Sequence, residues 1–339
     1  MNLLFTGIGG PTPLGLARSV KQAFPDSRCI GVDGSPWATN LYNSEIFDNT
    51  YQIVQGSHLK YWDVITEVIN DEKIDFAFVV PETEVLIWSE RKNQADLPCK
   101  TVIPDYELAS FCFDKLKVAT FLHGKGLTPQ TEEFKINEAL KIDFPFWIRV
   151  KSGAGALGAL KVKDQKDLDT WLTLHNFRED FIISEFLPGR NYACKLLYYN
   201  GELIQHASAE RIDYLLAAAA PSGISGMCAR GKLLNRGDLV ERSNEALHDI
   251  SKRTGVRLHG IFTVDFKEKS DGTPLITEVN IRHVSFNYAF TLGGINFAKT
   301  TLQKTLGLES DIQPPNTFKT ENYFLRGVDA PIRLIPIRD

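Results

Sequence analysis

The first 105 residues alternate short apolar runs with amphipathic stretches, and this order restricts the fold more than any other feature of the chain. Strand-like runs occur at NLLFTG, SRCIGVDG, YQIV, DFAFVVP and KTVIP, and helical patterns occur near residues 14–24, 59–70 and 82–92. Strands that alternate with helices form a parallel sheet with helices on both faces. The sequence therefore predicts a Rossmann-like α/β domain over residues 1–105.

The pattern changes after residue 105 to a mixed order that predicts an α+β arrangement. Helices are expected over residues 114–124, 164–176 and 237–254 and after Gly294, and strands at FPFWIRVKS, ALKVKD, DFIISEFLPG and NYACKLLYYNGELIQHASAE. The Asn-Gly pair inside the last of these segments is a typical hairpin turn. Residues 211–236, which include LLAAAAPSGISG, are rich in small residues and are expected to form a loop.

Charge and composition exclude several classes of protein. The 339 residues carry a net charge of −4 and contain no long basic run, which argues against nucleic-acid binding. The first residues lack the positive region of a signal peptide, and no apolar run reaches the length that spans a membrane. The five cysteines are scattered without disulfide or zinc spacing, as expected for reduced thiols in a cytoplasmic protein.

A predicted β-hairpin at residues 260–282 carries the clearest group of polar side chains. Asp265 lies on its first strand, while Glu278, Asn280 and Arg282 alternate on its second strand and therefore point to one face. Two carboxylates and an amide oxygen that converge across a hairpin form an oxygen-only site, which suits Mg²⁺ held partly by nucleotide phosphates. For this segment on its own, a surface hairpin whose polar residues face water is the alternative.

Two glycine-rich segments could cradle phosphates, and the first fits a dinucleotide only in part. Residues 7–12 (GIGGPT) follow a strand and precede a helix, and Asp33 ends the next strand where a ribose-binding acid would lie. However, Thr12 replaces the third glycine of the fingerprint, and Pro11 and Pro13 remove backbone donors. We therefore expect a tight strand-to-helix turn, with a nicotinamide-dependent oxidoreductase as the alternative.

The second glycine-rich segment lies between two predicted strands, with Gly153, Gly155 and Gly158 spaced as GxGxxG. No helix is expected after it, so a pyrophosphate would find no helix N-terminus there. Such a loop can instead fold over nucleotide phosphates and donate several backbone N–H groups. Arg149 and Lys151 alternate on the strand that leads into it, so both cations face either the phosphates or water at a sheet edge.

The order of these motifs resembles the ATP-grasp superfamily, and most of all the large subunit of carbamoyl-phosphate synthetase and related carboxylate–amine ligases. The motifs in chain order are LLFTGIGGPTPLG, Asp114-Lys115, Phe144-Pro145 before Arg149, the second glycine loop, EFLPG at residues 185–189, and Asp265 with Glu278-x-Asn280-x-Arg282. Together they cover roughly residues 1–300. The resemblance implies a pre-ATP-grasp domain over residues 1–105, followed by a two-lobed ATP-grasp domain with lobes at 106–187 and 188–339.

The resemblance also implies roles for individual residues. Asp265, Glu278 and Asn280 match Mg²⁺ ligands, with Mn²⁺ as a substitute ion, and Arg282 matches a residue that binds the substrate or the charge that develops on an acyl phosphate. The positions that match contacts to ATP phosphates, the lid above them or the adenine edge are Lys115, Arg149, Lys151, Gly153, Gly155, Gly158, Glu185, Phe186 and Leu187.

Three positions depart from the pattern of the family. Asn191 stands where related ligases usually carry a glutamate for the ribose hydroxyls, and a neutral amide should bind a hydroxyl less strongly. Val150 and Ile281 replace prolines that are common in relatives. None of these changes removes a metal ligand, so the resemblance implies an active enzyme.

The implied activity is that of an ADP-forming, Mg²⁺-dependent ligase that joins a small-molecule carboxylate to an amine through an acyl phosphate, with Arg149 and Arg282 as catalytic residues. No nucleic-acid or membrane partner is expected, and a homodimer is compatible with the sequence. Three alternatives remain: a phosphotransferase acting on a small carboxylate, an NAD(P)-dependent oxidoreductase, and a non-catalytic nucleotide-binding regulator. The candidate substrate contacts are Arg230, Arg282, His283, Asn287 and the loop over residues 211–236, with Glu82 and Glu84 at a strand end as further candidates.

Overall fold

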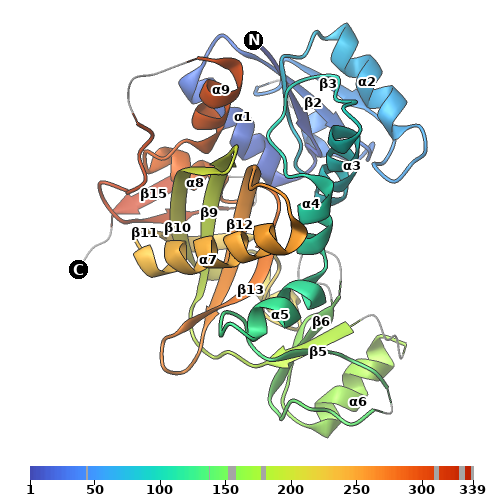
Figure 1. Ribbon diagram of the computed structural model, residues 1–339, viewed down its shortest axis with the longest axis vertical. Helices are drawn as coiled ribbons and strands as arrows, with labels where there is room; N and C mark the ends of the chain where they lie inside the picture. The colour runs from blue at the N-terminus through green and yellow to red at the C-terminus, as the bar shows by residue number, and fades with distance from the viewer. Residues whose placement is uncertain are drawn as a thin grey trace.

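In the residues that it describes, the computed structural model contains three β-sheets, whose arrangement is visible in Figure 1. It describes the chain except residues 43–44, 137, 152–157, 177–180, 309–312, 328–332 and 337–339. The predicted lid glycines Gly153 and Gly155 lie outside the described residues. In the described part of the chain, no helix is both long and apolar enough to cross a membrane. All five cysteines are free.

The N-terminal sheet is parallel, with strand order β3-β2-β1-β4, so the predicted Rossmann-like arrangement is confirmed. KTVIP does not form a strand, however: within it, only Lys100 pairs with the sheet, through an isolated bridge to Phe76. The elements are β1 (Asn2–Thr6), α1 (Pro11–Ala23), β2 (Arg28–Asp33), the 3₁₀ helix η1 (Thr39–Tyr42), β3 (Asn49–Gln52), α2 (Tyr61–Asp71), β4 (Phe76–Phe78) and α3 (Glu82–Asn93).

A small antiparallel sheet with strand order β5-β8-β6-β7 follows two short helices. Its buried side is filled by Phe146, Trp171 and Phe181, which belong to one apolar cluster. Asp164 caps α6 as predicted, since its Oδ1 accepts from the Asp167 N–H at 2.9 Å. The elements are α4 (Tyr106–Phe113), α5 (Lys115–His123), β5 (Thr131–Glu133), β6 (Phe146–Val150), β7 (Leu160–Val162), α6 (Gln165–Leu174) and β8 (Phe181–Glu185).

The third sheet has seven strands in the order β13-β12-β9-β10-β11-β14-β15. Helix α7 ends at Gly255 as predicted, with the left-handed φ of 74° that favours glycine. The elements are β9 (Asn191–Tyr199), β10 (Glu202–Tyr214), the 3₁₀ helix η2 (Ala217–Ala219), β11 (Cys228–Leu234), α7 (Gly237–Thr254), β12 (Gly260–Glu268), β13 (Pro274–Asn280), α8 (Asn287–Leu292), α9 (Phe297–Leu306), β14 (Asn322–Leu325) and β15 (Arg333–Pro336).

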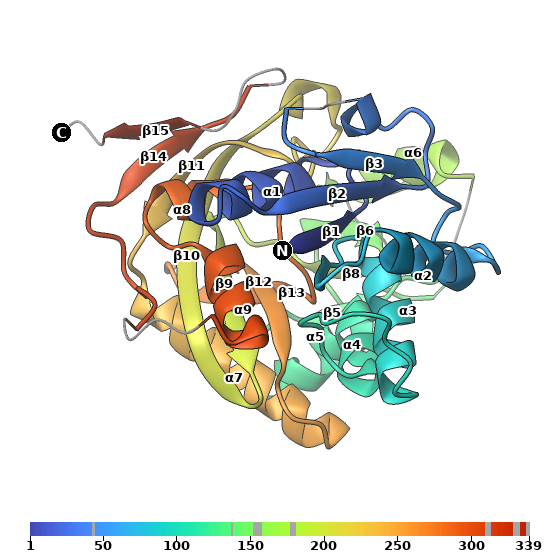
Figure 2. The ribbon, with the colours of Figure 1, turned by 90° about the horizontal axis from the view of Figure 1, so that it is seen from above.

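The two faces of this sheet bury different partners, because side chains alternate along each strand. On β9, Cys194 and Leu196 face α7, and they share an apolar cluster with Leu247. Ala193 and Leu197 face the opposite way, toward α8, α9 and the N-terminal domain. Figure 2 shows α1 beside α8, and these two helices are in contact. The large sheet is therefore covered on one side by α7 and on the other by the N-terminal domain with α8 and α9.

The prediction of a loop over residues 211–236 was wrong for residues 211–214 and 228–234, which are β-strands. β10 continues to Tyr214, and β11 returns over Cys228–Leu234 as its antiparallel neighbour. The alternating side chains of ERIDY and CARGKLL extend the hairpin, and the small residues occupy only the connection between the strands. That connection contains η2 and residues 222–227, which reach the site described below.

We expect Gly231→Ala to lower the free energy of unfolding by about 1–3 kcal/mol, as for other overpacked positions. A Cβ at Gly231 would lie 2.3 Å from Cζ of Phe324 and 2.5 Å from the Glu210 carbonyl oxygen. Gly124→Ala is the matched control, because no atom lies within 4 Å of the place that a Cβ would take there. Urea denaturation of both variants tests this, and equal stability of the two would contradict the packing of β14 on β11.

Candidate active site

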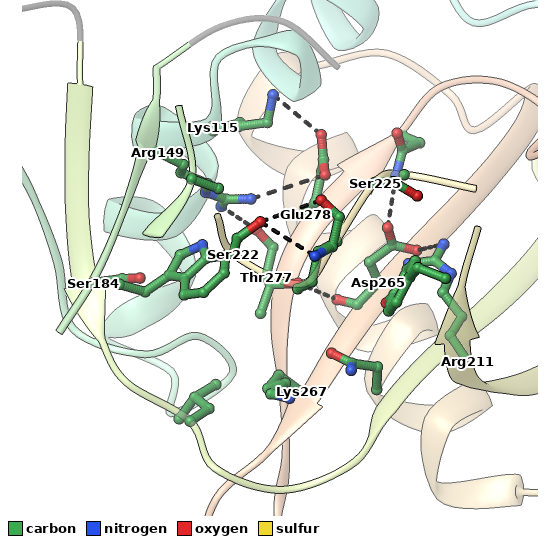
Figure 3. Close-up of a pocket in the computed structure, with 18 of the residues that line it drawn as sticks. Lys115, Arg149, Ser184, Arg211, Ser222, Ser225, Asp265, Lys267, Thr277 and Glu278 are labelled. Atoms are coloured by element: carbon green, nitrogen blue, oxygen red, sulfur yellow. Dashed lines mark hydrogen bonds and ion pairs between the residues drawn. The ribbon is translucent and has the colours of Figure 1, made fainter. Parts of the chain in front are cut away.

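A cavity of about 700 Å³ lies where the small sheet, the large sheet and the start of α1 meet. This volume is within the roughly 300–1,000 Å³ of typical small-molecule sites. The small sheet contributes Trp147, Arg149, Lys161 and residues 184–187, and the large sheet contributes side chains of β10, β12 and β13. Figure 3 shows the polar groups that point into it.

The hairpin of β12 and β13 brings the two predicted metal-binding carboxylates together. Asp265 lies directly opposite Glu278 in the antiparallel register, and both line the cavity. Asn280 lines it as well, and its Nδ2 lies 3.4 Å from Oδ2 of Asp265. The three oxygen-bearing side chains predicted to act together are therefore neighbours.

A β-bulge beside these carboxylates holds one of the cations. The register shifts after Asp265, so that Phe266 pairs with Ile276 and Thr277 has no partner opposite. The carbonyl oxygen of Thr277 accepts a hydrogen bond of 2.6 Å from Nη2 of Arg149. The bulge thus fixes the guanidinium of Arg149 from the small sheet against the hairpin of the large sheet.

Three cations neutralise the two carboxylates. Lys115 Nζ lies 3.2 Å from Oε1 of Glu278, and Arg149 Nη1 lies 3.9 Å from Oε2 of the same residue. Arg211 Nη2 donates to Oδ1 of Asp265 at 2.6 Å. Lys115 is placed by helix α5, whose first turn is capped by Asp114. The sequence pointed to the segment 211–236 but did not single out Arg211, although this residue continues the inward-facing alternation of Ala207 and Ala209 along β10.

These contacts shift the pKa values of the two carboxyl groups in opposite directions. Burial would raise the pKa of Glu278, but Lys115 and Arg149 outweigh burial and hold that pKa below its usual value. Burial raises the pKa of Asp265, and the Arg211 guanidinium opposes this shift. The difference arises because two cations face Glu278 and lower its pKa, whereas burial dominates at Asp265.

The predicted adenine-binding residues lie along another wall of the cavity. Glu185, Phe186, Leu187 and Asn191 all line it at the passage from β8 to β9. Lys161 Nζ lies 4.0 Å from the centre of the Phe186 ring, a cation–π contact that the sequence did not predict. This wall offers apolar side chains and backbone groups of the kind that bind a flat heterocycle.

Two predicted phosphate-binding positions differ in their placement. Gly158 follows the segment outside the described residues and has a φ of 64°, and its carbonyl oxygen accepts from Trp171 Nε1 at 3.0 Å. Lys151 does not line the cavity; its Nζ pairs with Oε1 of Glu133 at 2.8 Å. β6 ends at Val150, so the alternation that predicted a shared face for Arg149 and Lys151 stops before Lys151.

The candidate substrate residues are divided between the cavity and the core. Arg282 lines the cavity; its Nη1 donates to the His283 carbonyl oxygen at 3.2 Å, and its Nε lies 3.9 Å from Oε2 of Glu82. His283 and Asn287 are buried away from the cavity and contact Lys195. Arg230 lies outside the cavity lining, half exposed, and its Nε pairs with Asp213 at 2.7 Å.

Glu84 is buried inside the N-terminal domain, whereas the first glycine loop lies at its surface, where Pro11 and Thr12 line the cavity. Burial raises the pKa of Glu84 to about 7, and Tyr61 Oη donates to its carboxylate at 2.8 Å. Asp33 accepts from the Gly9 N–H at 2.7 Å and from the Ser35 N–H at 2.8 Å. Both carboxylate oxygens of Asp33 thus hold backbone N–H groups, one from the loop and one from Ser35, and thereby fix the tight strand-to-helix turn.

Among the described residues, no group of three or more His, Cys, Asp or Glu side chains could hold a metal ion. The site instead offers two carboxylates and one amide oxygen. This set suits an ion that completes its coordination with phosphate oxygens and water, as Mg²⁺ does in nucleotide sites.

Solved structures identify the architecture, whereas no protein-family model and no curated protein matches the chain. N5-carboxyaminoimidazole synthetase from Staphylococcus aureus, complexed with ADP, superimposes with a TM-score of 0.71 at 14% identity, covering 96% of this chain and 81% of that one. L-amino acid ligase from Bacillus licheniformis gives a TM-score of 0.68 at 15% identity and covers 96% and 79%. The chain has the ATP-grasp fold.

A third structure with the ATP-grasp fold is the biotin carboxylase domain dimer of 2-oxoglutarate carboxylase from Hydrogenobacter thermophilus, in complex with MgADP, ADP and bicarbonate. Its TM-score is 0.68 at 13% identity, with coverage of 96% of this chain and 74% of that one. The fold expected from the motif order, a parallel N-terminal domain followed by the two ATP-grasp lobes, is therefore confirmed.

We expect Lys115→Met to lower the free energy of unfolding at pH 7 by about 1–3 kcal/mol, because it leaves the buried charge of Glu278 with only the more distant Arg149. The folded-state pKa of Glu278 is below its usual value, so the pair stabilises the fold above about pH 4.3 and the stabilisation is lost as the pH falls through that lowered pKa. The loss caused by Lys115→Met should therefore shrink toward acid pH.

Lys117→Met is the matched control, because Lys117 lies on the same helix but its side chain is 63% exposed. Its Nζ lies 3.7 Å from Oδ2 of Asp114, and such an exposed ion pair contributes little to stability. Chemical denaturation of both variants between pH 3 and pH 8 measures the difference. A Lys115→Met penalty that is independent of pH would contradict the ion pair.

Proposed function

We propose that this protein is an ADP-forming ligase that uses Mg²⁺ and ATP to join a small-molecule carboxylate to an amine. The observation that carries the proposal is the arrangement of Asp265 and Glu278 across one hairpin, with Lys115 and Arg149 beside them. Carboxylates for a metal ion and cations for phosphates are the two parts that phosphoryl transfer requires, and here they share one cavity.

The charge of the cavity supports a polyanionic ligand. Its described lining contains three acidic side chains, Glu185, Asp265 and Glu278, and twice as many cationic ones. The six cations are Lys115, Arg149, Lys161, Arg211, Lys267 and Arg282. A triphosphate would balance this excess, and a bound Mg²⁺ would satisfy the carboxylates that the cations now neutralise.

The residues present fit a divalent ion and a nucleotide. Asp265, Glu278 and Asn280 would hold Mg²⁺, whose charge would offset that on the phosphates during transfer. Mn²⁺ prefers similar oxygen ligands and is the expected substitute. Phe186 and Leu187 would contact the adenine, and Asn191, which lines the cavity at the start of β9, would bind the ribose.

The protein's own side chains supply orientation and exclude water. Arg149 is held by the carbonyl of Thr277, so its guanidinium is already oriented before a phosphate arrives. Arg149 is largely buried, and a charge in such a site acts on the phosphates more strongly than it would in water. Lys115 can move its single ammonium from Glu278 to a phosphate oxygen without a change of backbone.

The acid would bind beside Arg282; we call the part of the cavity around Arg282 and Ser285 the acid-binding end. The cavity lining also includes the hydroxyl-bearing residues Thr12, Tyr214, Ser222 and Ser225. Arg282 would bind the carboxylate, and the hydroxyls could bind its polar substituents. The acid would accept the γ-phosphoryl group to form an acyl phosphate, which an amine would then attack with release of phosphate.

Release of ADP should require Mg·ATP, a carboxylic acid and an amine together. A coupled ADP assay with panels of carboxylic acids, amino acids included, each with and without a panel of amines, tests the reaction. Product mass would show the new amide bond. ADP formed with an acid alone, together with a stable phosphorylated product, would establish the phosphotransferase instead, and bound ATP without any turnover would overturn the ligase.

Glu278→Gln should reduce ADP release by at least about 100-fold, because the amide is a far weaker ligand for Mg²⁺ and a weaker partner for Lys115. Glu202→Gln is the control, since Glu202 is an exposed acid at the start of β10. Full turnover of the Glu278→Gln variant at saturating Mg²⁺ would refute the metal assignment.

A further inference from the structure

Lys195 is a fully buried lysine in the middle of the largest sheet. It occupies an inward position on β9 between Ala193 and Leu197, where the alternation of the strand calls for an apolar side chain. Among the described residues, no carboxylate forms an ion pair with it. An ammonium in such a place is costly unless its N–H groups are bound, so its contacts define its role.

Three groups surround the Lys195 ammonium. Its Nζ lies 2.6 Å from Nδ1 of His283 and is hydrogen-bonded to Oδ1 of Asn287. It also lies 4.5 Å from the centre of the Phe297 ring. Burial, and secondarily the charge of Lys195, holds the pKa of His283 well below its usual range, so its ring is neutral and Nδ1 can accept. Burial also lowers the pKa of Lys195. Its Nζ carries at least two N–H groups in either protonation state, one for Nδ1 of His283 and one for Oδ1 of Asn287.

Two of these acceptors stand at the two ends of one turn. His283 opens the turn over residues 283–287, and Asn287 closes it where α8 begins. Inside the turn, the Asn287 N–H donates to the Val284 carbonyl oxygen at 3.1 Å. One ammonium on a rigid central strand thus holds both ends of a five-residue segment.

The same turn shapes the acid-binding end. Val284 and Ser285 line the cavity, and the His283 carbonyl oxygen accepts from Nη1 of Arg282. The carbonyl oxygen of Arg282 is held in addition by Oγ1 of Thr263, the residue that pairs with Lys195 across β12 and β9. The position of the Arg282 guanidinium consequently depends on the turn behind it.

We propose that Lys195 is a positioning residue that fixes the turn over residues 283–287. By holding this turn, Lys195 places Arg282 and Ser285 at the acid-binding end and sets the affinity for the acid substrate. His283 and Asn287, which the sequence suggested as substrate contacts, act through this turn and do not touch the substrate. The assignment rests on the proposed function, because it names the acid as the ligand of Arg282.

Lys195→Met keeps an unbranched side chain as far as Cε and removes the amino group. We expect it to raise KM for the acid by about 10- to 100-fold, with KM for ATP unchanged within about twofold. Phe297→Leu is the matched control: it removes the ring on the other side of the ammonium and weakens the same core, but leaves both contacts to the turn. It should lower stability without changing KM for the acid.

Substitutions of His283 separate positioning from packing. His283→Gln retains an acceptor for Lys195, whereas His283→Leu removes it, so glutamine should restore most of the acid affinity that leucine loses. Equal effects of Lys195→Met and Phe297→Leu on KM for the acid, or a parallel rise in KM for ATP, would overturn the assignment.

A readout without turnover distinguishes this assignment from the proposed function. Phenylglyoxal labels exposed arginines, and peptide mass spectrometry gives the rate at Arg282, whose side chain is 20% exposed. Release of the turn should make labelling of Arg282 faster in Lys195→Met than in Phe297→Leu. If the wild-type protein shows no acid-dependent ADP release, the proposed ligase function is refuted, but the labelling experiment still tests the role of Lys195. Equal labelling rates at Arg282 in Lys195→Met and Phe297→Leu would refute that role.

Discussion

The pairing of β12 with β13 is the constraint on which the rest of the site depends. It places Asp265 opposite Glu278, and its bulge frees the carbonyl of Thr277 for Arg149. A slip of one residue in this register would turn the carboxylates to the face covered by α7. The apolar residues Val264 and Phe266 prevent such a slip, because they pack in the core on that face. The apolar residues on one face of the hairpin thus determine that the two carboxylates lie on the other face.

Two carboxylates so close together repel each other, and their neutralisation joins distant parts of the chain. Lys115 comes from α5, Arg149 from the small sheet and Arg211 from β10, so each cation ties a different element to the hairpin. A nucleotide with its metal ion brings both signs of charge at once. It can therefore replace these internal pairs without leaving either the cations or the carboxylates unpaired in a buried site.

The parts of the molecule that the sequence predicted are those set by local patterns. Alternation and turn residues located the β12–β13 hairpin with its polar face, and the N-cap of Asp164 and the C-cap of Gly255 marked helix ends. KTVIP has the apolar composition of a strand but pairs only at Lys100, since strand formation also needs a neighbour in register. Residues 211–214 and 228–234 were mistaken for parts of a loop because the run of small residues between them masked the alternation on either side.

What the sequence could not show is which polar residues meet through the interior. Arg282, His283 and Asn287 are close together in the chain, yet only the first reaches the cavity while the other two turn toward Lys195. Lys195 and Arg211 both stand at inward positions of apolar strands, and a cation at such a position always needs an explanation. Arg211 on β10 pairs with the carboxylate of Asp265 on β12, and β9 lies between these two strands. For Lys195 the explanation is a set of neutral acceptors on a turn, and neutral acceptors leave no charge pattern by which the sequence could reveal the pairing.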